Sequence, residues 1–171
     1  MNKGGKFMSI KTRKVVIVGS GNVGSHCAFS LAVQGVCDEI IMIDKIEKKA
    51  NAEAVDLSDT VSYLPHYVTS RKGTFEDCSD ADIIVVSLGV PPEPNKSRLD
   101  FLEGTIREVD TIIDPIMKSG FDGIIVVISN PVDVVANYIL EKTKLPKNRV
   151  FGTGTTLDSS RLRRILSHET G

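Results

Sequence analysis

The stretch that decides the fold is KVVIV-GSGNVG, residues 14–24, an apolar run that leads directly into a glycine-rich turn. A continuous run of β-branched residues is typical of a strand buried on both faces of a parallel sheet. Residues 22–34 follow with a helical pattern that stops at Gly35, a residue that commonly ends helices. The opening of the chain therefore predicts a strand, a tight glycine turn and a helix.

Similar apolar runs recur along the chain, with helical patterns between them. Strands are expected at residues 14–18, 39–44, 67–70, 82–88, 124–129 and 149–151. Strands that alternate with helices predict an α/β fold, a doubly wound parallel sheet whose crossover connections are helical. The continuously apolar runs at 15–18, 83–86 and 124–128 should form its centre.

Three helical patterns are expected to pack on this sheet. Residues 22–34 place Val23, Cys27 and Leu31 on one face, and residues 132–142 begin after Pro131 in a first-turn position. A third pattern covers residues 97–119 and follows a loop, 89–96, that contains three prolines. This loop leaves the carboxyl end of a central strand, which is where ligands bind in open α/β sheets.

The glycine turn has the pattern G-x-G-x-x-G, formed by Gly19, Gly21 and Gly24. We expect Gly19 to allow the turn, Gly21 to allow close approach of a pyrophosphate to the backbone N–H groups, and Gly24 to let the helix pack on the strand. Asn22 and Val23 lie between them and are expected to bind the cofactor together with the glycines if the turn is a nucleotide site. By itself the pattern is also compatible with a glycine turn that binds nothing.

Asp44 supplies the context that the pattern needs, because it ends the next strand twenty residues after Gly24. A carboxylate there accepts hydrogen bonds from ribose hydroxyls and repels a 2′-phosphate, which favours NAD over NADP. FAD and S-adenosylmethionine are the competing ligands for such a unit.

Composition narrows the function further. The net charge of −1 gives no basic surface for nucleic acid, and no apolar run is long enough to span a membrane. Cys27, Cys37 and Cys78 lack metal-ligand spacing and suit free thiols in a reducing compartment. The 171 residues suggest one domain, 14–171, after a flexible leader at 1–13, in a cytoplasmic protein without a metal.

Three further segments carry a family resemblance: SRLD at 97–100, SNPVD at 129–133 and GTGTTLDSSR at 152–161. Together with the glycine turn they resemble the L-lactate and L-malate dehydrogenases, a family that includes L-2-hydroxyisocaproate dehydrogenases. The resemblance implies a Rossmann domain with strand order 3-2-1-4-5-6 and helices on both faces of the sheet. It also implies reversible NADH-dependent reduction of a 2-oxo acid to the L-2-hydroxy acid, in a cytosolic homo-oligomer.

The resemblance assigns roles to four residues. Arg98 would close over the substrate and stabilise charge on its carbonyl oxygen, and Arg161 would bind the substrate carboxylate. Asn130 would contact the substrate oxygen and the nicotinamide ribose, and Asp158 would orient a catalytic histidine. The plain alternatives are a solvated loop arginine, a helix N-cap at Asn130 and an exposed ion pair between Asp158 and Arg161.

Further cofactor contacts follow from the same resemblance. The positions concerned are Val23, Gly89, Val90, Ile128, Ser129 and, more weakly, Lys49 and Thr153. The apolar ones could equally be core residues.

Two departures from the family pattern matter. Pro92 occupies the position that selects substrate, where lactate enzymes usually carry Gln and malate enzymes Arg, so an apolar 2-oxo acid such as pyruvate is favoured over a dicarboxylate.

The family's proton-transferring histidine and its substrate domain lie beyond the last residue of this sequence, and His26, His66 and His168 match no histidine motif. We therefore expect residues 14–171 to end in the first helix of the missing catalytic domain and to be inactive alone. A non-catalytic NAD-binding module, a malate dehydrogenase fragment and a remnant unable to fold are the alternatives.

Overall fold

The computed structural model describes residues 11–89 and 101–171, and within them the chain forms one six-stranded sheet. The strand order is β3-β2-β1-β4-β5-β6, and every neighbouring pair is parallel. The strands are β1 (Lys14–Val18), β2 (Glu39–Ile43), β3 (Thr69–Lys72), β4 (Ile83–Val86), β5 (Ile124–Val127) and β6 (Val150–Gly152). This is the Rossmann order 3-2-1-4-5-6, so the expected fold class is confirmed.

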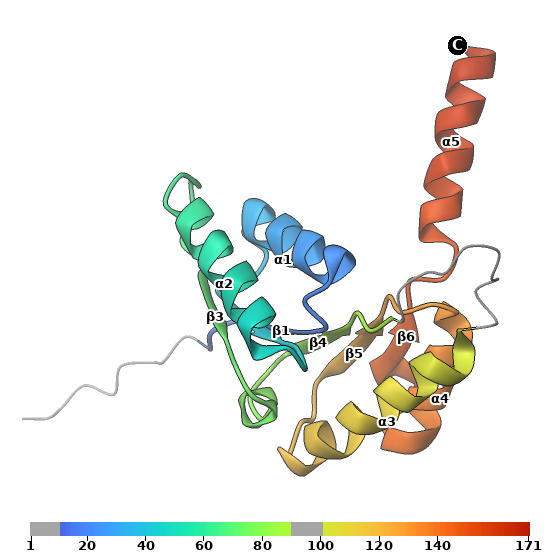
Figure 1. The fold of residues 1–171 in the computed structure, drawn as a ribbon. Coiled ribbons are helices and arrows are strands. Elements are labelled where there is room, and N and C mark those ends of the chain that lie inside the picture. The colour runs from blue at the N-terminus through green and yellow to red at the C-terminus, as the bar shows by residue number, and fades with distance from the viewer. Residues whose placement is uncertain (1–10, 90–100) are drawn as a thin grey trace, which may run out of the picture.

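Helices cover both faces of the sheet (Figure 1). They are α1 (Asn22–Gln34), α2 (Glu47–Val61), α3 (Leu102–Lys118), α4 (Val132–Thr143) and α5 (Thr156–Thr170), with 3-10 turns η1 (Phe75–Cys78) and η2 (Lys147–Arg149). One core lies between the sheet and α1 and α2, and the other lies between the sheet and η1, α3 and α4. The strand order reverses between β1 and β4, which creates the crevice where such sheets bind ligands.

Two local expectations need correction. On α1, Cys27 and Leu31 are partly buried against the core as expected, but Val23 is 61% exposed, and the fully buried residues are Gly24, Ala28 and Ala32. Strand β3 begins two residues later than expected, at Thr69, whose N–H donates to the carbonyl of Asp38.

Helix α4 also begins differently from the sequence expectation. Pro131 is its N-cap and not a first-turn residue, so the alternative of Asn130 as the N-cap is wrong. The Asn130–Pro131 peptide bond is cis, and the side chain of Pro131 makes no capping hydrogen bond. Val135 and Ile139 are buried on the face of α4 that was expected to pack on the sheet.

Ion pairs fasten the amino-terminal edge of the sheet. Arg13 Nη2 lies 2.7 Å from Asp38 Oδ1, and the buried Lys14 Nζ lies 2.6 Å from Asp80 Oδ1. The hydrogen bonds from the side chain and backbone of Arg13 lower the pKa of Asp38 from 3.8 to about 2. Lys11 pairs with Asp82. Residues 11–13 are thus joined to the domain, whereas residues 1–10 of the expected leader lie outside the described residues.

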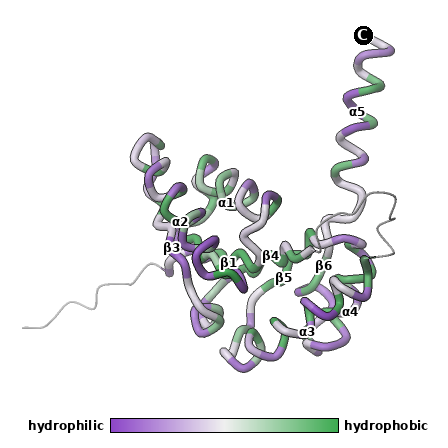
Figure 2. Tube along the Cα trace, in the orientation of Figure 1, coloured by the Kyte–Doolittle hydropathy of each residue, from purple (hydrophilic) through white to green (hydrophobic). Residues whose placement is uncertain are grey.

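Helix α5 stands away from the rest of the domain (Figure 1) and has no buried residue. Hydrophobic and hydrophilic residues alternate along it (Figure 2). Its exposed apolar residues are Leu157, Leu162, Ile165 and Leu166. Within residues 11–89 and 101–171, no helix combines the length and apolarity that a membrane crossing needs.

Candidate nucleotide-binding site

The glycine turn lies in the crevice where the strand order reverses, and it contacts the ends of both β2 and β4. The N–H of Gly19 donates to the carbonyl of Ile43 at the end of β2, over 2.8 Å. Gly19 has φ +101°, and a Cβ on it would lie 2.3 Å from the carbonyl oxygen of Ser87, just after β4. Only glycine fits a left-handed conformation in such close contact. The role predicted for Gly19 in the turn therefore has a clear steric basis.

Gly24 and Gly21 differ sharply in the space around them. A Cβ on Gly24 would lie 1.9 Å from the carbonyl oxygen of Gly19, so the first turn of α1 packs directly on the preceding loop. A Cβ on Gly21 would meet a single group within 4 Å, the Nζ of Lys49 at 3.9 Å. The N-terminus of α1 is therefore open at Gly21, with an ammonium group beside it. Free N–H groups and a helix dipole make such an end a suitable place for an anion.

Asp44 is fixed beside this turn. Its Oδ2 accepts a hydrogen bond from the N–H of Ser20 over 2.7 Å, and its Oδ1 accepts one from the N–H of Ile46 over 2.9 Å. The carboxylate is half-buried, and each oxygen retains a lone pair that a ribose hydroxyl can use. The structure thus brings Asp44 next to the glycine turn, as the spacing in the sequence predicts.

The carboxyl ends of β4 and β5 form the other side of the crevice. The Ser129 hydroxyl accepts a hydrogen bond from the N–H of Leu88 over 2.7 Å and donates to the carbonyl of Val86 over 3.2 Å. Ser129 is 3% exposed, so its side chain joins the two strand ends, whereas Asn130 after it is exposed. A Cβ on Gly89 would meet nothing within 4 Å.

Three of the predicted site residues, Val90, Pro92 and Arg98, lie outside the described residues. Ile128 is half-buried and donates its N–H to the carbonyl of Val86. Thr153 is exposed and donates its N–H to the carbonyl of Val127.

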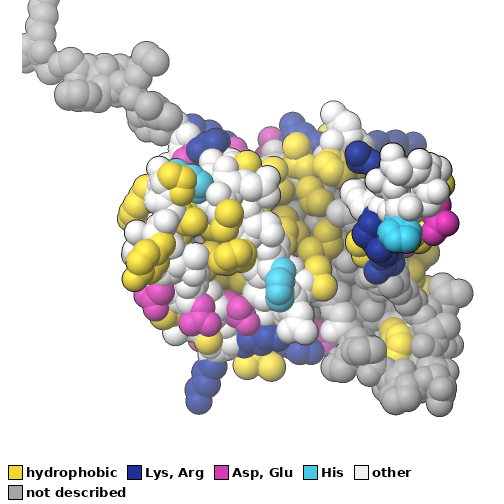
Figure 3. Space-filling model, turned by 90° about the horizontal axis from the view of Figure 1, so that it is seen from above, with side chains coloured by type: hydrophobic (Ala, Val, Ile, Leu, Met, Phe, Trp, Pro, Cys, Tyr) yellow, Lys and Arg dark blue, Asp and Glu magenta, His cyan; other side chains and the backbone are white. Residues whose placement is uncertain are grey.

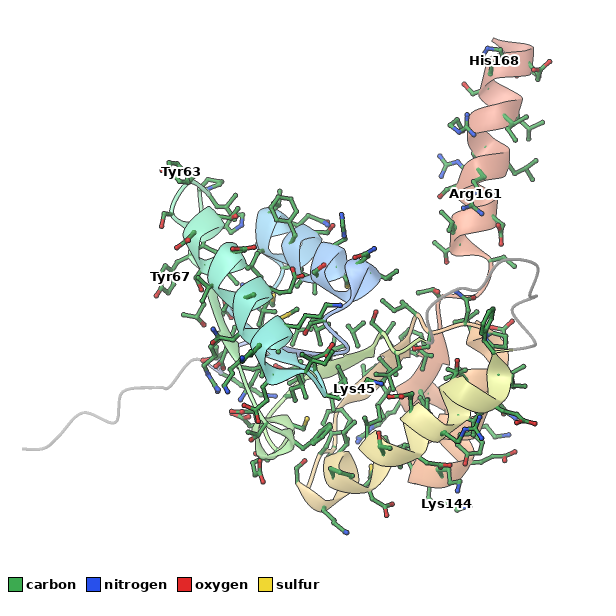
Figure 4. All side chains as sticks on the ribbon, in the orientation of Figure 1. Lys45, Tyr63, Tyr67, Lys144, Arg161 and His168 are labelled. Atoms are coloured by element: carbon green, nitrogen blue, oxygen red, sulfur yellow. The ribbon has the colours of Figure 1, made fainter. Side chains whose placement is uncertain are left out.

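The predicted pair on α5 is formed, since Arg161 Nη1 lies 3.1 Å from Asp158 Oδ1, with both side chains exposed. Arg161 and His168 are on the projecting helix, apart from the α1–α2 layer (Figure 4). Seen from above, α5 and the α1–α2 layer lie on either side of a recess with hydrophobic side chains on its floor (Figure 3). The structure groups the glycine turn and Asp44, but it does not bring Arg161 to them.

The histidines have local roles. His66 places Nε2 2.5 Å from the carbonyl oxygen of Ala32 and packs on Gly35, so it joins the segment after α2 to the end of α1. His26 bonds to the carbonyl of Asn22 on its own helix, and His168 lies 3.4 Å from Glu169. In the described part of the chain, no cluster of three or more His, Cys, Asp or Glu residues could hold a metal ion.

Sequence reasoning missed one contact at this site, between two residues that are far apart in the sequence. Lys45 Nζ lies 2.7 Å from Glu108 Oε1 on α3. Lys45 could have been considered from its place directly after Asp44, but its partner is 63 residues away and no spacing rule indicates it.

Comparison with known proteins identifies the family of this chain. A family model described as the NAD binding domain of lactate/malate dehydrogenase matches residues 13–152. The L-lactate dehydrogenase of Fusobacterium nucleatum is 49% identical over 161 residues, which are 94% of this chain and 50% of that protein. L-lactate dehydrogenase 3 of Bacillus cereus is 44% identical over 160 residues, which are 94% of this chain and 51% of that protein.

Solved structures of lactate and malate dehydrogenases are similar to this chain in fold. The minor L-lactate dehydrogenase from Enterococcus mundtii, in its ligands-bound form, superposes with a TM-score of 0.89 at 41% identity, over 94% of this chain and 51% of that one. The malate dehydrogenase from Archaeoglobus fulgidus in complex with NADH gives a TM-score of 0.85 at 32% identity, over 91% of this chain and 53% of that one.

The chain spans about half the length of the curated relatives it matches. The matched half contains the glycine turn, Asp44 and all six strands. The family expected from the motifs is therefore confirmed, and the chain belongs to the lactate/malate dehydrogenases, with the sequence and fold of their NAD-binding domain.

Proposed function

We propose that this chain binds NAD(H) in the crevice at the glycine turn and is the nucleotide-binding part of an L-2-hydroxy-acid dehydrogenase of the L-lactate type. The observation that carries the proposal is the pairing of an open helix N-terminus at Gly21 with the fixed carboxylate of Asp44. These are the two groups that a pyrophosphate and an adenosine ribose require.

The dinucleotide is oriented by groups of opposite charge. The pyrophosphate lies against the N–H groups at Gly21, Asn22 and Val23, with the Lys49 ammonium beside it. The ribose hydroxyls donate to Asp44. A 2′-phosphate would bring two negative groups together there, so NAD is preferred to NADP. Ile128, Ser129, Asn130 and Thr153 lie at the carboxyl ends of β5 and β6, where the nicotinamide half would extend.

When bound, NADH supplies the hydride for reduction of a 2-oxo acid. In this proposal Arg98 stabilises the negative charge that develops on the carbonyl oxygen, while Asn130 orients that oxygen. Arg161 holds the substrate carboxylate through a bidentate contact, and Asp158 orients the histidine that transfers a proton. Pro92 cannot pair with a second carboxylate, so pyruvate or a branched apolar homologue is preferred to oxaloacetate.

The full-length relatives are about twice as long as this chain. We therefore assign the proton-transferring histidine and the remaining substrate contacts to residues outside the sequence described here. The complete enzyme would act as a cytoplasmic homo-oligomer, and the unpaired Cys27, Cys37 and Cys78 fit a reducing compartment.

Titration of the 171-residue chain with NADH tests the proposal. Binding should enhance NADH fluorescence and raise the thermal midpoint as ligand concentration increases, with a weaker response to NADPH. A folded chain that responds to neither nucleotide would refute NAD binding. Appreciable turnover of pyruvate by this chain would refute the assignment of the missing histidine to other residues.

A further inference from the structure

An ion pair crosses the edge of the crevice next to Asp44. Lys45 directly follows Asp44, and its Nζ lies 2.7 Å from Oε1 of Glu108, a residue of α3. Lys45 comes from the turn between β2 and α2, whereas α3 packs on the opposite face of the sheet from α2. The pair therefore bridges the two helical layers at the carboxyl edge of the sheet, in the centre of Figure 4 where Lys45 is labelled.

Both ends of this bridge are held by the fold. The Asp44 carboxylate accepts a hydrogen bond from the N–H of Ile46, which fixes the backbone on either side of Lys45. Glu108 precedes Val109, which is fully buried in the core beneath α3. The Lys45 side chain is 70% exposed and that of Glu108 is 32% exposed. The bridge thus lies at a fixed place, with one side open to solvent.

The position of the bridge fits an adenine ring. With the ribose hydroxyls on Asp44 and the pyrophosphate at Gly21, the base must lie on the side of the ribose away from the glycine turn. Ile46, which follows Lys45, is 56% exposed and offers an apolar surface. The methylene chain of Lys45 adds to that surface, and an ammonium group held near the ring face attracts its π system.

We propose that the Lys45–Glu108 ion pair forms a wall of the adenine-binding part of the nucleotide site and strengthens binding of the adenosine half. Glu108 acts as a positioning residue: it holds the Lys45 side chain extended across the crevice, so that less side-chain freedom is lost when the base binds. The inference rests on the proposed function, because it takes the ribose position from Asp44.

An ordinary surface ion pair would behave differently. Such pairs contribute little to stability, and a pair with no role at the site would leave ligand binding unchanged when it is removed. Simple electrostatics makes a third prediction, since removing the negative charge of Glu108 should favour an anionic dinucleotide. The three accounts therefore predict different effects of Glu108→Gln on dinucleotide binding: weaker binding if the pair forms part of the site, no change for an ordinary surface pair, and tighter binding from electrostatics alone.

The test measures the dissociation constants of NADH and of ADP-ribose, which contains the adenosine half without nicotinamide, for the 171-residue chain. Glu108→Gln removes the charge and keeps the side-chain length, whereas Lys45→Met keeps an apolar chain without the ammonium. Asp110→Asn is the matched control, because Asp110 is on the same helix and pairs with Lys142 over 3.5 Å, toward α4. Thermal midpoints show that each variant is folded.

Glu108→Gln and Lys45→Met should each weaken binding of both ligands about two- to fivefold at low salt, and Asp110→Asn should leave it unchanged. The difference between wild type and Glu108→Gln should shrink as salt screens the pair. Unchanged or tighter ADP-ribose binding by Glu108→Gln would overturn the inference while leaving the proposed function intact. If the folded wild-type chain binds neither ligand, the proposed function fails and the inference fails with it.

Discussion

The substitution Gly21→Ala separates ligand binding from folding. Gly21 has φ −71° and ψ −176°, an extended conformation that alanine adopts without strain, and the added methyl group would meet only Lys49 Nζ at 3.9 Å. Alanine is a poorer N-cap than glycine by a few tenths to about 1 kcal/mol, but it stabilises by about 0.4–1 kcal/mol through the unfolded chain. The free energy of unfolding should therefore change by less than about 1 kcal/mol, and the thermal midpoint by less than about 4 °C.

Binding should change far more than stability. The methyl group would occupy the open space in front of the N–H groups at the start of α1, where the pyrophosphate is proposed to bind. Loss of one hydrogen bond to a charged group removes about 1.5–3 kcal/mol, which weakens NADH binding about 10- to 150-fold. Fluorescence titration with NADH gives the affinity, and circular dichroism with thermal unfolding gives the stability. A folded Gly21→Ala variant that binds NADH as tightly as wild type would refute the pyrophosphate position.

Gly24→Ala should instead destabilise the fold by about 1–3 kcal/mol, because its methyl group would lie 1.9 Å from the carbonyl oxygen of Gly19; urea unfolding measures the loss, and wild-type stability would contradict the packing argument. Asp38 has a pKa of about 2 in the folded chain against 3.8 ordinarily, so its contribution to stability is complete above about pH 4 and is lost as the pH falls toward 2. Asp38→Asn should accordingly flatten the acid side of the stability profile, and an unchanged profile between pH 4 and about 2 would show that the Arg13 contact is unimportant. Burial raises the pKa of Cys78 to about 12 and that of Cys37 to about 11, so iodoacetamide should modify the partly exposed Cys27 first in the native chain; mass spectrometry of the peptides checks the order.

Much of the fold could be predicted because the strands are buried on both faces. The bounds of β1 and α1 follow from the apolar run at 14–18 and from the glycines that flank residues 22–34, and the structure has both as expected. The edge strand β3 was misplaced because Tyr67 and Val68 have high β propensity, although pairing with Glu39 begins only at Thr69. At the edge of a sheet, hydrogen bonding to the neighbour sets the bounds more than side-chain preference does.

The site was predicted unevenly for a similar reason. The glycine turn and Asp44 belong to a local pattern, which can be recognised from the spacing of its residues in the sequence. The buried residues of α1 were predicted only in part: Cys27 and Leu31 are partly buried against the core, but the smaller Ala28 and Ala32 are fully buried. The contact between Lys45 and Glu108 depends on how two crossover connections meet at the sheet edge, which no local pattern encodes.

The close contact between Gly19 and the carbonyl of Ser87 has a mechanical consequence. With no room for even one added carbon atom, the turn that begins α1 and the end of β4 act as a single rigid support. A shift of this turn toward β4 would therefore displace Ser87, which is followed by Leu88 and Gly89, where the chain leaves the sheet. The point at which the following segment leaves the sheet is therefore in direct contact with the turn that we propose as the pyrophosphate site.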